Sequence, residues 1–181
     1  MHLHALPADD AAVRRYVEAL WLPYQRELAS IVDDHALADD VDLVEAELDY
    51  RLAQLEDDDH RICVAVDDVA ADALDRQSLT DGTGTLAGFV ITTVNDSPPV
   101  FDRPNRLVVD DLYVRDPYRG TGLARRLLER AADQAHEAAC PQLALDVDVD
   151  NDRAIAFYDR QGFEPLRRRL VVATDDVAGD R

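Results

Sequence analysis

The sequence contains no lysine, although its 181 residues include 19 basic side chains, all of which are arginine. Among the acidic residues, aspartate outnumbers glutamate by 30 to 8. The resulting net charge of −19 repels nucleic-acid phosphates and anionic lipids, so we expect neither nucleic acid nor membrane as a partner. The absence of lysine also excludes a Walker-type nucleotide loop.

Cysteine and long apolar runs are scarce as well. Cys63 and Cys140 stand alone, without a CxxC pair or a histidine cluster, so we expect no metal. Two free thiols in apolar surroundings favour a reducing compartment. No apolar run approaches the roughly 18 residues of a membrane helix, and residues 1–6 lack the features of a secretory signal. The sequence therefore predicts a cytoplasmic protein.

The excess of aspartate has two interpretations. One is a halophilic surface, because molar salt screens charge repulsion within about 3 Å. The other is an electrostatic funnel for a cationic substrate. The acids are spread along the whole chain, which favours the first interpretation and leaves the second open.

Hydrophobic periodicity predicts helices and strands in mixed order, in one domain over residues 1–173 with a polar tail at 174–181. We expect Pro23 to break or kink the first helix, and a long connection at 67–84. The predicted helices are 8–30, 40–56, 121–139 and 152–160, and the predicted strands are 61–66, 85–94, 106–114, 142–149 and 166–172.

The segment 106–126 carries the most specific pattern. A predicted strand leads through a proline-containing turn into Gly120-Thr121-Gly122, and a long helix follows. The first amides of a helix lack intrahelical acceptors and lie at the positive end of its dipole, and glycine lets a pyrophosphate approach them. The pattern predicts a phosphate site, with a plain glycine turn as the alternative. It is not a Rossmann loop, because Arg125 stands where G-x-G-x-x-G requires its third glycine.

This segment resembles the GNAT superfamily of N-acetyltransferases. The run from Arg119 to Ala124 matches the family motif R/Q-x-x-G-x-G/A, with Gly122 in the middle. A second block, residues 151–163, resembles the family segment that follows its fifth strand. The two matches occur in the family's order and together cover residues 106–165.

The resemblance implies an α/β (α+β) fold, in which a mixed, splayed β-sheet is flanked by α-helices. It implies acetyl-CoA as co-substrate where the fourth and fifth strands part, with its pantetheine arm along the fourth strand. The implied cofactor-binding residues are Leu112, Tyr113, Val114, Arg119, Gly120, Thr121, Gly122, Leu123, Ala124, Arg125 and Asn151. An N-cap role is equally open for Asn151. The family ends in a hairpin, whereas a single final strand is expected here.

Asp110 and Tyr158 are the catalytic candidates. An alkyl ammonium with a pKa of about 10.4 costs roughly 4–5 kcal/mol to deprotonate at pH 7, and a carboxylate can accept its proton. Strand alternation predicts Asp110 on the face of Leu112 and Asp111 on the other. The pair resembles the acidic pair of spermidine/spermine acetyltransferases; Asp110 is the preferred base and Asp111 the alternative. Tyr158 matches the family tyrosine that reprotonates the thiolate, with a packing aromatic as the alternative.

The predicted function is direct acetyl transfer from acetyl-CoA to a primary amine of a small molecule. Polyamines, aminoglycoside-like amines and amino acids are the candidate acceptors. Two alternatives stay open: a protein or peptide N-terminal acetyltransferase, and a non-catalytic coenzyme A-binding module. A homodimer is also considered.

Overall fold

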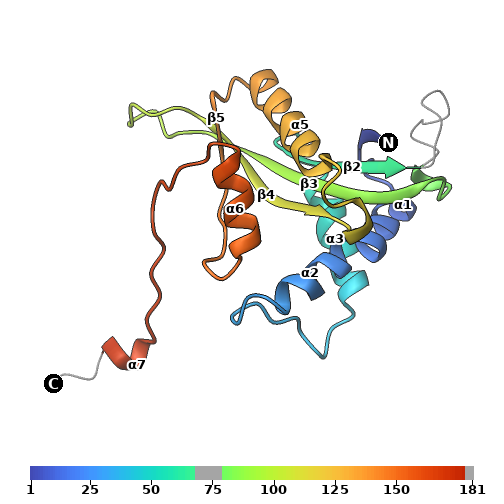
Figure 1. The fold of residues 1–181 in the computed structure, drawn as a ribbon, viewed down its shortest axis with the longest axis horizontal. Coiled ribbons are helices and arrows are strands. Elements are labelled where there is room, and N and C mark those ends of the chain that lie inside the picture. The colour runs from blue at the N-terminus through green and yellow to red at the C-terminus, as the bar shows by residue number, and fades with distance from the viewer. Residues whose placement is uncertain (68–78, 178–181) are drawn as a thin grey trace. The chain divides into compact units, whose positions relative to one another are not determined.

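The computed structural model describes residues 1–67 and 79–177, which fall into two compact units. The first unit, Met1–Asp146, holds a five-stranded sheet in the order β1-β2-β3-β4-β5. Its first four strands pair antiparallel and β5 pairs parallel with β4. The sheet is therefore mixed and flanked by helices, as the sequence predicted (Figure 1). A single domain over 1–173 stays a prediction.

The elements have the following bounds. In the first unit they are β1 His2–Ala5, α1 Asp10–Tyr16, the π-helical turn η1 Val17–Trp21, α2 Leu22–Ala29, α3 Leu43–Gln54, β2 His60–Asp67, β3 Thr85–Asn95, β4 Arg106–Val114, the 3₁₀ turn η2 Asp116–Tyr118, α5 Leu123–Glu137 and β5 Gln142–Ala144. The second unit, which begins at Val147, contains α6 Asp152–Arg160 and α7 Thr174–Val177. None of the described helices is long and apolar enough to cross a membrane.

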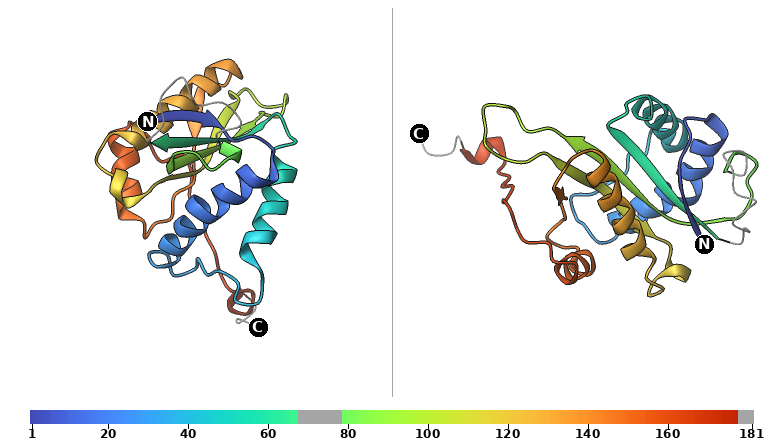
Figure 2. Two further views of the ribbon diagram at one scale, coloured as in Figure 1. Left: turned by 90° about the vertical axis from the view of Figure 1, so that its right-hand side faces the viewer. Right: turned by 90° about the horizontal axis from the view of Figure 1, so that it is seen from above.

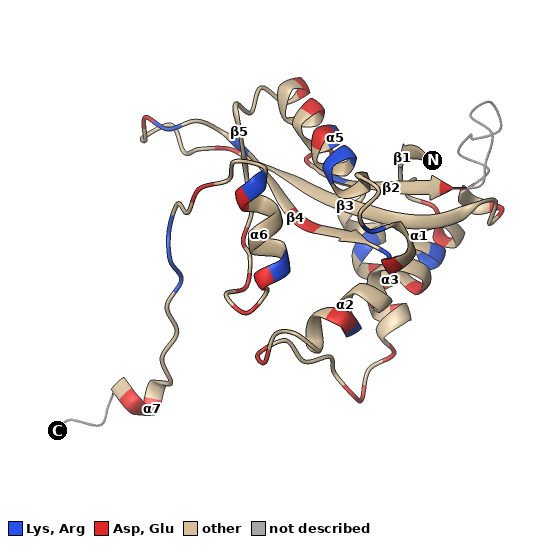
Figure 3. Cartoon of the chain, in the orientation of Figure 1, with Lys and Arg blue, Asp and Glu red and all other residues tan. Residues whose placement is uncertain are grey.

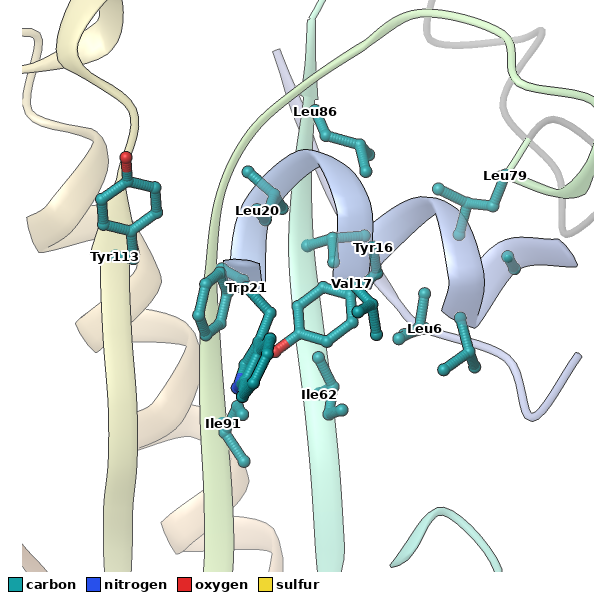
Figure 4. Close-up of a cluster of buried hydrophobic side chains, with 14 of the residues drawn as sticks. Leu6, Tyr16, Val17, Leu20, Trp21, Ile62, Leu79, Leu86, Ile91 and Tyr113 are labelled. Carbon is teal, nitrogen blue, oxygen red and sulfur yellow. The ribbon is translucent and has the colours of Figure 1, made fainter. Parts of the chain in front are cut away.

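The main core lies between the sheet and the layer formed by α1, η1, α2 and α3 (Figure 2). Alternate residues of β2 and β3 point into it, among them Ile62, Val64, Phe89 and Ile91, each at most 1% exposed. Tyr16, which is fully buried, and the larger Trp21, which is 8% exposed, contribute the bulkiest side chains from the helical layer (Figure 4). Burying one such apolar side chain stabilises the fold by about 1.5–3 kcal/mol. The opposite face of the sheet is covered by α5.

Of the two predicted effects of Pro23, a break and a kink, the structure excludes the break. The helix does not end there; instead the π-helical turn Val17–Trp21 immediately precedes α2, and Pro23 lies in the first turn of α2. Proline lacks an amide hydrogen and clashes with the carbonyl four residues earlier. The extra residue of a π turn relieves both problems, so the helical layer stays continuous from α1 to α2.

Two predicted strands differ from the structure, and one observed strand was not predicted. The predicted strand at 142–149 is cut to Gln142–Ala144, and β1, which was not predicted, adds an edge strand. The predicted strand at 166–172 is wrong, because no ladder forms there and Leu170 is 88% exposed. High β-propensity describes fitness for a half-buried sheet position and does not supply a pairing partner. Residues 68–78 of the predicted connection lie outside the described residues.

Acidic side chains are distributed over helices and loops rather than gathered at one place (Figure 3). Several bind arginines on the surface, such as Glu45, which pairs with Arg14 at 2.6 Å. Exposed pairs of this kind stabilise a protein by at most about 1 kcal/mol. The distribution thus matches a solvated acidic surface better than a single focused field.

Candidate functional site

The loop between β4 and α5 presents free amides to open space. Gly120 and Gly122 have φ angles of +74° and +87°, in the left-handed region that glycine favours. A Cβ atom at either position would meet nothing within 4 Å. Among the described residues, no acceptor takes a hydrogen bond from the backbone amides of residues 120–125. These amides lie at the positive end of the 15-residue helix α5, an arrangement that binds phosphate groups.

Arg119 braces this loop from inside the protein. Its Nε donates to the Val114 carbonyl at 2.9 Å, and its Nη2 donates to both carboxylate oxygens of Glu27 at 2.6 and 2.8 Å. Its guanidinium also lies 5.7 Å from the centre of the Tyr113 ring. The side chain predicted at the start of the motif therefore ties the loop to β4 and α2. Glu27 was missed, because no local pattern pairs residues 92 positions apart.

The remaining loop residues offer mainly backbone to a ligand. The Thr121 hydroxyl donates to the Tyr118 carbonyl at 2.7 Å, and Arg125 Nε donates to Glu129 at 3.0 Å on the surface. Leu123 is 2% exposed, so its side chain belongs to the interior. Among the described residues, no group of three or more histidine, cysteine or acidic side chains is arranged to hold a metal ion.

A β-bulge in β4 changes which face Asp110 occupies. Ile91 pairs with Asp111 and Thr92 pairs with Val109, so Asp110 has no opposite residue on β3. The Asp110 carboxylate accepts a hydrogen bond from Thr93, which lies on the same face as Ile91. Asp110 and Asp111 therefore share the face that carries the helical layer. The predicted alternation, which placed Asp110 with Leu112, is wrong because a bulge inserts one residue and interrupts the alternation.

Asp111, the residue that follows Asp110, is held in a polar network. Its Oδ1 accepts from the Tyr24 hydroxyl at 2.9 Å, and its Oδ2 lies 3.9 Å from Arg51, which also pairs with Glu47. Burial raises the pKa of Asp111 to about 6, although the Tyr24 hydrogen bond and the Arg51 charge both oppose the shift. Burial likewise raises the pKa of Glu47 against the influence of Arg51. Asp111 is thus the enclosed member of the pair, and Asp110 the exposed one.

The outer edge of β4 is open beyond its first three residues. β5 pairs with Arg106, Leu107 and Val108 only, so the two strands part after Val108. The Arg115 amide donates to Ala87 on β3, and amides along a strand alternate between its two edges. The amide of Leu112 therefore points away from β3, toward an edge where the described residues provide no strand. An extended ligand with amide groups can pair along this edge.

Two predicted site residues lie in the second unit. Asn151 caps α6, where its Oδ1 accepts from the Ala154 amide at 3.1 Å, so the N-cap interpretation is confirmed. Tyr158 lies on α6 with its ring 5.2 Å from Phe157 and 5.5 Å from Phe163, measured between ring centres. Both aromatic neighbours of Tyr158 belong to the same unit.

Comparisons with known proteins agree with this geometry. A sequence model of the Acetyltransferase (GNAT) family matches residues 20–163. The chain is 33% identical over 85 residues to N-alpha-acetyltransferase MAK3 of Arabidopsis thaliana, an overlap of 47% of this chain and 43% of that protein. The chain spans about half or less of the length of the curated relatives that it matches.

Solved structures share the fold at low sequence identity. A tetramutant of the BH1408 protein from Bacillus halodurans superposes with a TM-score of 0.71 and 18% identity, over 96% of this chain and 99% of that one. The aminoglycoside N-acetyltransferase AAC(6')-Iy, in complex with a CoA-containing bisubstrate analogue, gives 0.63 and 16% over 96% and 97%. Because the family match extends through β4, the Arg119–Ala124 motif and α6, the predicted resemblance is confirmed: the chain belongs to the GNAT acetyltransferase family.

Proposed function

We propose that this protein is an acetyl-CoA-dependent N-acetyltransferase that transfers the acetyl group directly to a primary amine of a small molecule. The observation that carries the proposal is the β4 bulge. It leaves Asp110 exposed and without a strand partner, two residues from the amide of Leu112 on the open edge. One short stretch of chain would thereby supply both a base and a hydrogen-bond donor for the thioester oxygen.

The loop and the open strand edge fit coenzyme A. The amides of residues 120–125 would bind its pyrophosphate, and the braced position of Arg119 keeps them directed at one place. The edge at Leu112–Val114 would pair with the amides of the pantetheine arm. Bound in this way, acetyl-CoA would supply the activated acetyl group, and the Leu112 amide would stabilise the charge that develops on the thioester oxygen.

Asp110 would hold the acceptor ammonium and take its proton, directly or through a water molecule. Deprotonating an alkyl ammonium costs roughly 4–5 kcal/mol at pH 7, so a placed carboxylate contributes substantially to the rate. Asp111 is bonded to Tyr24 and lies beside Arg51, which suits it to shape the site rather than to exchange protons. Tyr158 is assigned to reprotonating the coenzyme thiolate by family resemblance.

A second candidate is a peptide N-terminal acetyltransferase, which the identity with MAK3 favours. An α-amino group has a pKa of about 8, so it needs only about 1 kcal/mol for deprotonation at pH 7. Such an enzyme would depend much less on Asp110. A coenzyme A-binding module without turnover is the third candidate.

A panel assay separates these candidates. Polyamines, aminoglycosides, amino acids and short peptides are each incubated with acetyl-CoA, and release of the thiol is followed. We expect turnover with a small amine, and a loss in Asp110→Asn that recovers as the pH is raised. Turnover confined to peptides would replace the proposal by the second candidate, and coenzyme binding without any transfer would replace it by the third.

A further inference from the structure

A chain of hydrogen bonds crosses three neighbouring strands on the face that Asp110 occupies. Thr93 Oγ1 donates to Asp110 Oδ2 at 2.7 Å, and His60 Nδ1 lies 3.0 Å from the same threonine oxygen. The register places His60 on β2 directly opposite Thr93 on β3. The chain therefore runs from a buried histidine to the exposed carboxylate on the bulge of β4.

The hydrogen-bonding roles within this chain can be assigned. The single hydroxyl proton of Thr93 is used on the Asp110 carboxylate, so its oxygen accepts, and His60 must donate from Nδ1. Burial, reinforced by the charge of Arg51, lowers the pKa of His60 and keeps the ring neutral at pH 7. The other ring nitrogen of His60 then carries no proton.

If packing were its only role, a buried histidine at position 60 would lower the stability of the fold relative to an apolar side chain. The side chain is 7% exposed, and its Nε2 has no hydrogen-bond partner in the described part of the chain. An unsatisfied buried polar atom costs about 1–3 kcal/mol, which an apolar side chain would avoid. In the described structure, the hydrogen bonding of the His60 side chain is directed at Thr93.

We propose that Thr93 and His60 are positioning residues that hold the Asp110 carboxylate in one orientation for proton transfer from the acceptor amine. The inference rests on the proposed function. A carboxylate on an exposed bulge samples several rotamers unless it is held, and a misplacement of about 1 Å in a reacting group can cost roughly 10²-fold in rate. Thr93 supplies the hold, and His60 fixes the direction of the Thr93 hydroxyl.

Steady-state kinetics on paired variants test this proposal. Thr93→Val keeps the shape but removes the hydroxyl, whereas Thr93→Ser keeps the hydroxyl; His60→Leu removes the donor, whereas His60→Asn retains an N–H near the Nδ1 position. We expect kcat to fall about 10- to 100-fold in Thr93→Val and His60→Leu, and to recover largely in Thr93→Ser and His60→Asn. Coenzyme affinity should not change. Thr92→Val is the control, because its hydroxyl bonds Gln134 on the opposite face at 2.8 Å.

The same substitutions in an Asp110→Asn background show whether Thr93 acts through Asp110. We expect Thr93→Val to have no further effect there, because the group that it positions is gone. Near-normal kcat in folded Thr93→Val, or an equal fold-loss in both backgrounds, would overturn the inference while leaving the proposed function intact. If the wild-type protein acetylates no amine, both the inference and the proposed function are wrong. If Thr93→Val does not fold, the His60→Leu and His60→Asn pair makes the same comparison.

Discussion

Replacing Gly122 by alanine tests the phosphate loop with little disturbance of the fold. The φ angle of Gly122 is +87°, and an added Cβ atom would meet nothing within 4 Å, so the substitution introduces backbone strain without a clash. Left-handed backbone costs a non-glycine residue about 1–2 kcal/mol. For a chain of this size the melting temperature should fall by about 2–8 °C.

The effect on coenzyme A should be larger than this strain explains. The new methyl group would stand beside the free amides of residues 120–125, which a pyrophosphate must approach to hydrogen-bond distance. Losing one charge-assisted hydrogen bond costs about 1.5–3 kcal/mol, which corresponds to about 10- to 100-fold weaker binding. Titration calorimetry with coenzyme A measures this directly.

Gly82→Ala is the matched control. Gly82 has a φ angle of +76° and equally open surroundings, but it lies in the turn before β3. Both variants should lose similar stability, and Gly82→Ala alone should keep the wild-type affinity. Unchanged affinity in Gly122→Ala, or an equal loss of affinity in both variants, would refute the assignment of this loop to the pyrophosphate.

Four further predictions address chemistry and stability. Tyr158→Phe should lower turnover roughly 10²–10⁴-fold without changing coenzyme affinity. Raising the pH should not restore turnover in Tyr158→Phe, whereas it should in Asp110→Asn. Near-normal turnover in Tyr158→Phe would make Tyr158 a packing residue. Because burial raises the pKa of Asp111 to about 6, the folded state retains a proton that the unfolded state releases. Stability should therefore fall as the pH rises from about 4 to 6, by at most about 3 kcal/mol, and urea unfolding of Asp111→Asn should lack this component. Burial raises the pKa of Cys63 to about 11 and also raises that of Cys140, so both thiols should react with a chromogenic disulfide at pH 8 only after denaturation. With a net charge of −19, the melting temperature should rise between about 0.1 M and 2 M KCl, since screening relieves repulsion; a flat or falling curve would favour a substrate funnel.

Local signals were sufficient for two elements that carry predicted site residues. The strand 106–114 and the helix 152–160 have the predicted bounds. Strong β-forming residues define the strand, and the helix begins after its N-cap Asn151 and ends before Gly162. The loop between β4 and α5 was recognisable because its two glycines and the following helix are contiguous in sequence. Phosphate binding at a helix start depends on a few consecutive residues.

Non-local pairing accounts for what the sequence did not predict. The bulge at Asp110 exists only in the register between β3 and β4, and it reverses the face expected from alternation. The partners His60, Thr93 and Glu27 come from other strands and helices, so no spacing along the chain points to them. The predicted strand at 166–172 has the composition of a strand but no ladder partner in the described structure.

The sequence by itself determined the family, the glycine-bearing loop that leads into α5 and the presence of an acidic pair, because each depends on adjacent residues. The tertiary structure alone decided that Asp110 and Asp111 share a face, that Thr93 and His60 lie behind Asp110, and that Arg119 is bound to Glu27. Those relations depend on how separate strands and helices align. That alignment is set by burial and hydrogen bonding across the whole sheet, not by any single segment.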